Sequence, residues 1–353
     1  MSHYEERLEA DLLHIRDWVW SMGEDVEQAL RDAKKVLFIH DQRLAYATVL
    51  RDHPINRESR ECDRLCHAFI ARHLPSAGHL REMASTIRVN VALERIGDYA
   101  VTICREAMQL DGPVPEQFAG DIDTLADEAL DILTRSREAF RDNNAEQAIA
   151  AMQAVKRIRA RMDGIYEALF AADERMDGRT MMAVFVILNL FKRTADQAKN
   201  ICDQTVYSVR GVRKLPKVHR VLFLDRPGAG LGQLAVAIGH KLYPETGLFK
   251  CATPGRSDLV SGHLKDFLDS TGLPADDLET EPLEAIRHDI ADFDLVISLQ
   301  GHFGDHIGRL PFHTSGLDWD LGEVEGADLA AHYRYLRQML TELVTMLAGE
   351  HAS

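Results

Sequence analysis

The chain has 353 residues, 46% of them hydrophobic and 27% charged, which excludes a disordered or fibrous protein and is long enough for two hydrophobic cores. Its formal net charge of −15 argues against a nucleic-acid binder, because phosphate neutralisation needs clustered Lys and Arg. The longest mostly apolar run, residues 181–191, is shorter than the roughly 20 residues that a membrane span needs. We therefore expect two domains and no transmembrane segment.

The N-terminus and the cysteines indicate a cytoplasmic protein. Glu5 and Glu6 lie near the start, and no basic stretch precedes an apolar one, so no secretory or mitochondrial signal is predicted. The five cysteines are odd in number and contain no CxxC pair, which predicts neither a disulfide framework nor a structural zinc site.

Residues 1–209 have the pattern of long amphipathic helices. Apolar residues recur at steps of three and four between Leu8 and Leu37, with no competing strand pattern. Similar stripes follow, separated by turn signals such as Pro75. The pattern predicts six helices, at residues 8–37, 41–74, 76–110, 115–140, 144–171 and 179–209.

The six helices form two copies of a three-helix unit. A shift of 98 residues superposes the third helix on the sixth and matches polar as well as apolar positions. Core packing alone would not require Arg and Asp to repeat, so the shift indicates a duplication and predicts two stacked three-helix bundles. The matched residues are Arg81, Met83, Arg95, Asp98, Ala100, Ile103 and Cys104 with Arg179, Met181, Arg193, Asp196, Ala198, Ile201 and Cys202.

A basic stretch, residues 210–219, separates two compositions. There are 31 basic and 35 acidic residues up to residue 219, but 10 and 21 beyond it. We interpret 210–219 as a solvated linker, with a functional basic patch as the alternative. The predicted organisation is therefore a helical domain at 1–209, this linker, and a second domain at 220–353.

The second domain alternates strands with helices. Apolar runs predict strands at residues 221–224, 248–252 and 294–299. Helical patterns lie between and after them, and this alternation predicts an α/β domain with an open parallel sheet covered on both faces. The predicted helices are residues 233–242, 259–270, 284–288 and 328–347.

A glycine-rich loop joins the first of these strands to its helix. Gly228, Gly230 and Gly232 alternate there, and such a loop before a helix can expose backbone amides to a small anion or nucleotide. The pattern lacks a Lys and the full dinucleotide fingerprint. A tight strand-to-helix turn is the alternative that we favour.

Residues 93–103, LERIGDYAVTI, resemble the signature of the PhoU family of regulators of bacterial phosphate uptake. Residues 52–56 match its D-x-x-I-N element, and Leu80 and Arg81 match the end of its P-x-x-x-D-L-R element, with His79 in place of the Asp. The resemblance spans about residues 1–210. It implies the duplicated six-helix architecture and a regulatory role.

The same resemblance implies metal binding by carboxylates of the E-x-x-x-D motif, with a divalent or ferric ion. Glu94 and Asp98 leave one helix face and can share a hard cation, with Asp52 on the preceding helix. In the second repeat only Asp196 survives, because Lys192 replaces the matching Glu. Ion pairs with neighbouring arginines are the alternative role of these carboxylates.

Residues 220–349 resemble a low-molecular-weight protein tyrosine phosphatase or arsenate reductase, whose first strand leads into a C-x-x-x-x-x-R-S loop. Here Asp225 stands at the nucleophilic Cys and Leu231 at the phosphate-binding Arg. The later acidic element is also altered around Trp319, with Glu323 in place of its Asp. We therefore predict a catalytically degenerate pseudophosphatase domain and no enzyme activity.

The predicted function is regulation of phosphate uptake and of phosphate-starvation signalling by binding. The resemblance implies a homodimer that connects a phosphate ABC transporter with a membrane sensor histidine kinase, in the cytoplasm or held at the inner membrane by these partners. A small-anion or nucleotide sensor that uses the glycine loop is the alternative. Phosphatase or arsenate reductase activity is the third hypothesis.

Overall fold

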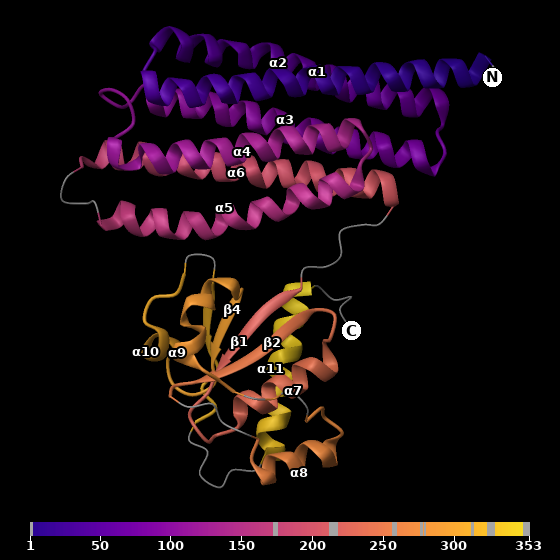
Figure 1. Cartoon of the computed structure of the whole chain (residues 1–353). Helices are drawn as coiled ribbons and strands as arrows, with labels where there is room; N and C mark the ends of the chain where they lie inside the picture. Colours follow the sequence, from indigo (N-terminus) through magenta and orange to yellow (C-terminus); the bar gives the residue numbers. More distant parts are fainter. Residues whose placement is uncertain are drawn as a thin grey trace. The chain divides into compact units, whose positions relative to one another are not determined.

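The structure is a computed structural model that separates into two compact units, Met1–Lys214 and Leu215–Ser353 (Figure 1). None of the helices in the described part of the chain is both long and apolar enough to cross a membrane. The structure describes residues 3–171, 176–211, 218–255, 260–275, 278, 280–311, 314–322 and 329–348.

The first unit consists of the six long helices that the periodicity predicts, so the expected helical bundle is confirmed. The first helix begins five residues earlier than its apolar stripe, with polar residues in its first turn. The helices are α1 (His3–Ile39), α2 (Gln42–His73), α3 (Ala77–Ala107), α4 (Glu116–Arg141), α5 (Ala145–Ala171) and α6 (Gly178–Arg210).

Local signals set the helix ends. The Asp41 carboxylate accepts hydrogen bonds from the backbone N–H groups of Arg43 and Leu44 and so caps α2. Asp177 caps α6 in the same way, and Gly211, with φ of 68°, ends it in the left-handed conformation that glycine tolerates best.

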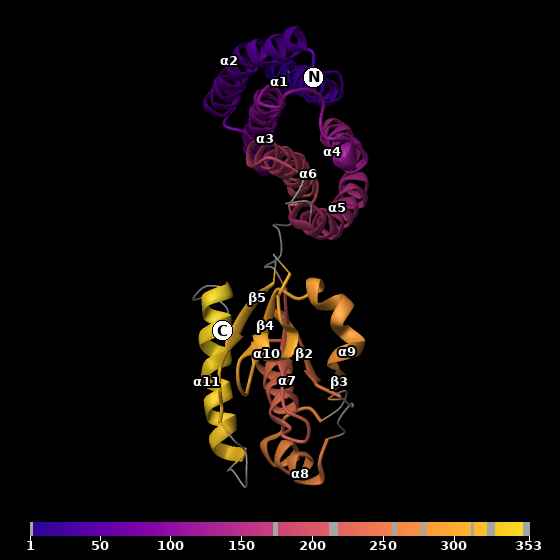
Figure 2. The same cartoon turned by 90° about the vertical axis from the view of Figure 1, so that its left-hand side faces the viewer.

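The two repeats share one hydrophobic core. Helices α1–α3 form one bundle and α4–α6 the other, with α3 packed against α6 and α1 against α4 (Figure 2). Buried residues of all six helices belong to a single apolar cluster. The repeated residues Ile103 and Ile201 are both completely buried in it, so the duplication placed equivalent side chains in a common interior.

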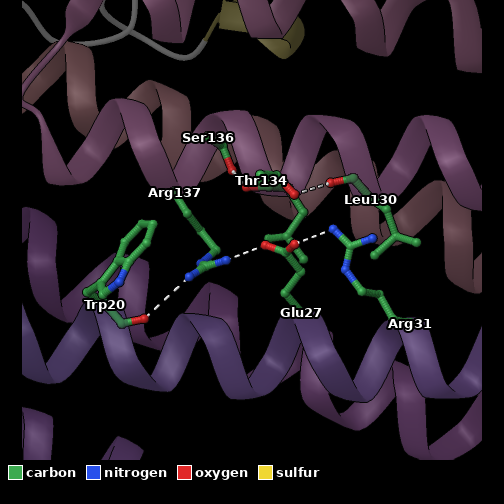
Figure 3. A network of polar contacts seen from close by, with 8 residues as sticks. Trp20, Glu27, Arg31, Leu130, Thr134, Ser136 and Arg137 are labelled. Atoms are coloured by element: carbon green, nitrogen blue, oxygen red, sulfur yellow. Dashed lines mark hydrogen bonds and ion pairs between the residues drawn. The ribbon is translucent and has the colours of Figure 1, made fainter.

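A buried ion pair joins the repeats inside this core. Arg137 of α4 donates to the carboxylate of Glu27 of α1, and Arg31 donates to the other oxygen of Glu27 at 2.5 Å (Figure 3). The Arg137 guanidinium also donates to the Trp20 carbonyl oxygen at 3.4 Å and lies over the Trp20 ring. Burial alone would raise the pKa of Glu27, but Arg31 and Arg137 hold it below its usual value.

The second unit is an α/β fold with the predicted parallel sheet. All five strands are parallel, in the order β3-β2-β1-β4-β5. The strands are β1 (His219–Leu224), β2 (Gly247–Thr253), β3 (Glu281–Pro282), β4 (Leu295–Ser298) and β5 (Ser315–Asp318). The helices are α7 (Leu231–Leu242), α8 (Gly262–Thr271), α9 (Leu283–Ile286), a 3-10 helix (Arg287–Asp292), α10 (Phe303–Ile307) and α11 (Leu329–Ala348).

Alternate residues of β1 enter two different cores, so helices cover both faces of the sheet as predicted. Phe223 belongs to the core that contains α7, α8 and α11. Leu222 and Leu224 point to the other face, where they pack with residues of α9 and the 3-10 helix. β1 therefore contributes side chains to both cores.

Two strands and one helix were not predicted from the sequence. β3 has only two residues, one of them a proline, and β5 is largely exposed and contains Gly316 and Asp318, which favour turns. Helix α10 is a single turn without buried residues. Most of the predicted linker and the start of the predicted helix at 259–270 lie outside the described residues.

Replacing Arg137 with Met should destabilise the chain by about 3 kcal/mol, because Glu27 would lose its buried cationic partner and keep only the exposed Arg31. Arg141→Met is the matched control. Arg141 also lies over the Trp20 ring, but its partner Asp142 is exposed, so a cost below about 1 kcal/mol is expected. Urea unfolding followed by far-UV circular dichroism measures both, and equal losses would contradict the assigned role of the buried pair.

Candidate functional site

Helices α2 and α3 bring three of the four predicted metal-site carboxylates together. Asp52 lies on α2, while Glu94 and Asp98 lie one turn apart on α3. Asn56, one turn after Asp52, donates to Asp52 Oδ2 at 2.6 Å. Asp52 Oδ1 is buried and has no hydrogen-bond partner in the described part of the chain. Asp52 Oδ1 can therefore accept a hydrogen bond from an external donor or coordinate a cation.

Burial and neighbouring carboxylates of this cluster raise the pKa values of Glu94 and Asp98. Burial raises the pKa of Glu94, and the charges of Asp98 and Asp52 raise it further, against a lowering by Arg95. Burial and Asp52 likewise raise the pKa of Asp98. The first repeat therefore carries negative charge that its own cations do not neutralise.

The donor chemistry of the cluster suits a hard cation, since carboxylate and amide oxygens are the ligands that Ca²⁺, Mg²⁺ and similar ions prefer. Within the residues that the structure describes, no three Asp, Glu, His or Cys side chains converge on one point as a metal would require. The cluster has the composition of an oxygen-ligand site but not a preformed cage.

The second repeat has a different charge arrangement at the matching position. Lys192 Nζ lies 3.4 Å from Asp196 Oδ2, one helical turn away on α6. The next residue, Arg193, extends its guanidinium over the Tyr99 ring of α3, at 5.2 Å from the ring centroid. A lysine of the chain thus already pairs with Asp196, at the position where the first repeat has Glu94.

In the second unit, the glycine loop surrounds the Asp225 side chain. Asp225 is only 3% exposed, and it accepts the backbone N–H of Arg226 at 2.9 Å and that of Gly232 at 2.8 Å. Between these two amides, Gly228 and Gly230 have φ of 80° and 74°, a left-handed conformation that glycine tolerates best. Amides that would face a bound anion here face a side chain of the chain itself.

Among the described residues, Cys251 lies beside the loop but is not suited to nucleophilic attack on phosphate. A Cβ at Gly232 would lie 2.9 Å from Cys251 Cβ, so this cysteine packs directly against the loop. Burial, and then the charge of Asp225, raises the pKa of Cys251 to about 12, which keeps the thiol protonated at neutral pH. Leu231, at the position of the phosphate-binding Arg, is completely buried. Glu323 lies outside the described residues.

Comparison with known proteins identifies the first unit. The model of the PhoU domain matches residues 19–107 and again residues 122–205, one match for each repeat. A phosphate-specific transport system accessory protein PhoU of Serratia marcescens is 30% identical over 212 residues, which cover 59% of this chain and 87% of that protein. The chain belongs to the PhoU family.

Other members of the family support the assignment. The phosphate-specific transport system accessory protein PhoU of Escherichia coli is 28% identical to this chain, over 59% of this chain and 88% of its own length. The crystal structure of PhoU from Pseudomonas aeruginosa is 28% identical and superposes with a TM-score of 0.55, covering 58% of this chain and 99% of that one. The PhoU resemblance and its two-repeat architecture are confirmed, and both family matches end before β1.

Two polar contacts of the structure, the Glu27–Arg137 ion pair and the hydrogen bonds of Asp225, have no sequence pattern that predicts them. The Glu27–Arg137 pair gave no signal, because its partners are 110 positions apart and each looks like one more charge on an amphipathic helix. The hydrogen bond from the Gly232 amide to Asp225 is likewise not evident from the sequence, because a carboxylate seven residues before a glycine has no characteristic pattern.

The carboxylate cluster should make stability depend on pH. In the folded chain the pKa values of Glu94 and Asp98 lie above their ordinary values, so the folded state takes up protons at a higher pH than the unfolded chain. The free energy of unfolding therefore rises as the pH falls from neutrality through the raised pKa values towards the ordinary ones.

The double variant Glu94→Gln/Asp98→Asn removes the repulsion and should be more stable than the wild type at neutral pH, by roughly 0.5 kcal/mol, because partial exposure screens the charges. The difference should shrink as the pH falls to about 4. Urea unfolding at both pH values, in the presence of a chelator, measures it. A variant that is less stable at neutral pH, or a difference independent of pH, would contradict the assignment.

Proposed function

We propose that the chain regulates phosphate uptake as an accessory of a phosphate-specific transport system, acting through protein contacts and not through catalysis. The observation that carries the proposal is that PhoU-domain matches cover both repeats, while relatives with that accessory description align over 87% and 88% of their own length. Most of the length of such a protein is therefore represented in the first unit.

The proposed partners are the ATPase of a phosphate ABC transporter and a membrane sensor histidine kinase, with the chain acting as a homodimer in the cytoplasm or at the inner membrane. The surface of α2 supports protein docking. Tyr46 and Leu50, one turn apart, are 60% and 63% exposed, close in sequence to the carboxylate Asp52. Large apolar side chains at such exposure are suited to burial against another protein.

Affinity capture of the tagged full chain from detergent-solubilised native cells, grown in high and in low phosphate, tests this proposal. We expect recovery of a transporter ATPase or a sensor kinase, in an amount that depends on phosphate. Tyr46→Ser/Leu50→Ser should reduce the recovery at least fivefold, and Leu13→Ser/Met182→Ser, with equally exposed residues on other helices, should not. Absence of both partners in both conditions would refute the proposal.

A metal at Asp52, Glu94 and Asp98 forms the second part of the proposal. The unpartnered Asp52 oxygen and the raised pKa values support it, because a cation would supply the missing partner and neutralise the cluster. When bound, a divalent or ferric ion would cross-link α2 to α3. Added Mn²⁺ should stabilise the chelator-treated wild type more than Glu94→Gln/Asp98→Asn, and equal effects would argue against this site.

The second unit is proposed to be a pseudophosphatase domain without activity. Asp225 at the position of the nucleophile, the protonated Cys251 and the buried Leu231 support this assignment. Turnover of an aryl phosphate or of arsenate that Asp225→Asn abolishes would overturn it. A sensor that binds a small anion or nucleotide at Gly228, Gly230 and Gly232 is less well supported, because the Asp225 carboxylate already accepts hydrogen bonds from the loop.

A further inference from the structure

Three arginines recur every seven residues along α3, at Arg81, Arg88 and Arg95. At 1.5 Å of rise per residue, neighbouring members lie about 10 Å apart along the helix on nearly the same face. That face borders α6. Arg88 and Arg95 line a hollow whose opposite wall is α6, and the Arg81 guanidinium carbon lies 3.4 Å from where a Cβ on Gly211, at the end of α6, would be.

The hollow between α3 and α6 has a volume of about 550 Å³ and is open to solvent. Its α6 wall consists of amide side chains and one aromatic ring, with one carboxylate, Asp203, that is paired with Lys199 at 3.3 Å. Gln204 keeps its Oε1 buried without a hydrogen-bond partner among the described residues. The lining residues of this wall are Gln197, Asn200, Asp203, Gln204 and Tyr207.

The two arginines of the hollow are exposed and their charges are largely uncommitted. Neither Arg88 nor Arg95 makes an ion pair within 4 Å in the part of the chain that the structure describes. Arg95 is near enough to Glu94 to lower the pKa of that carboxyl, while Arg88 affects none of the carboxyls whose pKa is shifted. In a chain with a net charge of −15, this hollow is a local exception.

We propose that the hollow between α3 and α6 binds a linear oligophosphate anion, either free or as the phosphate chain of a nucleotide. A guanidinium donates two parallel N–H groups to phosphate oxygens, and two such groups about 10 Å apart at their Cα atoms can reach the two ends of one triphosphate. A single phosphate would engage only one of them. The volume lies in the range of small-molecule sites.

Inorganic triphosphate and ATP share the proposed chemistry, and the α6 wall distinguishes them. Tyr207 offers a ring on which a base can stack, and the amides of Gln197, Asn200 and Gln204 offer donors and acceptors to its edge. A nucleotide should therefore gain affinity from the α6 wall. The affinity for an inorganic triphosphate should depend on Arg88 and Arg95 alone.

Isothermal titration of the full chain with inorganic triphosphate and with ATP, without added metal, tests the proposal. We expect saturable binding at one site per chain, weakened at least tenfold in Arg88→Ala/Arg95→Ala. The control Lys35→Ala/Arg57→Ala removes the same charge from exposed positions on α1 and α2 and should change the affinity less than twofold. Circular dichroism verifies that each variant is folded.

The variant Tyr207→Ala distinguishes a nucleotide ligand from an inorganic phosphate chain. If ATP binds more tightly than triphosphate and the variant loses only that advantage, the ligand is a nucleotide. Equal affinities identify an inorganic chain. Absence of saturable binding of either probe up to about 1 mM, or equal losses in the arginine and control variants, would overturn the proposal. None of these outcomes depends on the capture of a transporter or kinase.

Discussion

The arrangement of the helical unit depends on the buried ion pair between Glu27 and Arg137. It connects the first helix of one repeat to the first helix of the other from within the apolar core, while Lys34 of α1 pairs with Asp123 and Asp127 of α4 nearer the surface. A Cβ at Gly23 would lie 2.4 Å from Arg137 Nε, so the absence of a side chain there is what lets the guanidinium reach Glu27. Because an unpaired buried charge is costly, the pair favours one relative placement of the repeats and thereby of α3 and α6.

On this fixed scaffold the two repeats have diverged in charge. The first keeps Asp52 close enough to Glu94 and Asp98 to add to the effect of burial and raise the pKa values of both, while in the second Lys192 pairs with Asp196. The exchange of one Glu for Lys turns a carboxylate pair into an intrahelical ion pair without disturbing the buried side of the helix. Duplication therefore preserved the packing positions, such as Ile103 and Ile201, and left the solvent side free to change.

The parts of the fold that the sequence predicts are those with many residues contributing to one pattern. Six helices follow from long apolar stripes, and the duplication follows from a shift that matches whole helices. β3 and β5 were missed because they are short and are held by pairing with β2 and β4 instead of by their own hydrophobic pattern. The site residues on α2 and α3 follow from a motif. The spacing of Arg81, Arg88 and Arg95 is that of an ordinary solvated helix face, and only the packing of α6 beside α3 makes it one wall of a hollow.

The two places where this chain offers donors to an anion differ in what already occupies them. In the second unit the amides of Arg226 and Gly232 bind the Asp225 carboxylate, which is covalently attached and so is present at a high effective concentration. A free anion would have to displace this side chain and leave a carboxylate buried beside it. In the first unit the guanidinium groups of Arg88 and Arg95 face water, and an anion would replace only solvent. If the chain senses a phosphate compound directly, the physical argument therefore favours the hollow between α3 and α6 over the glycine loop.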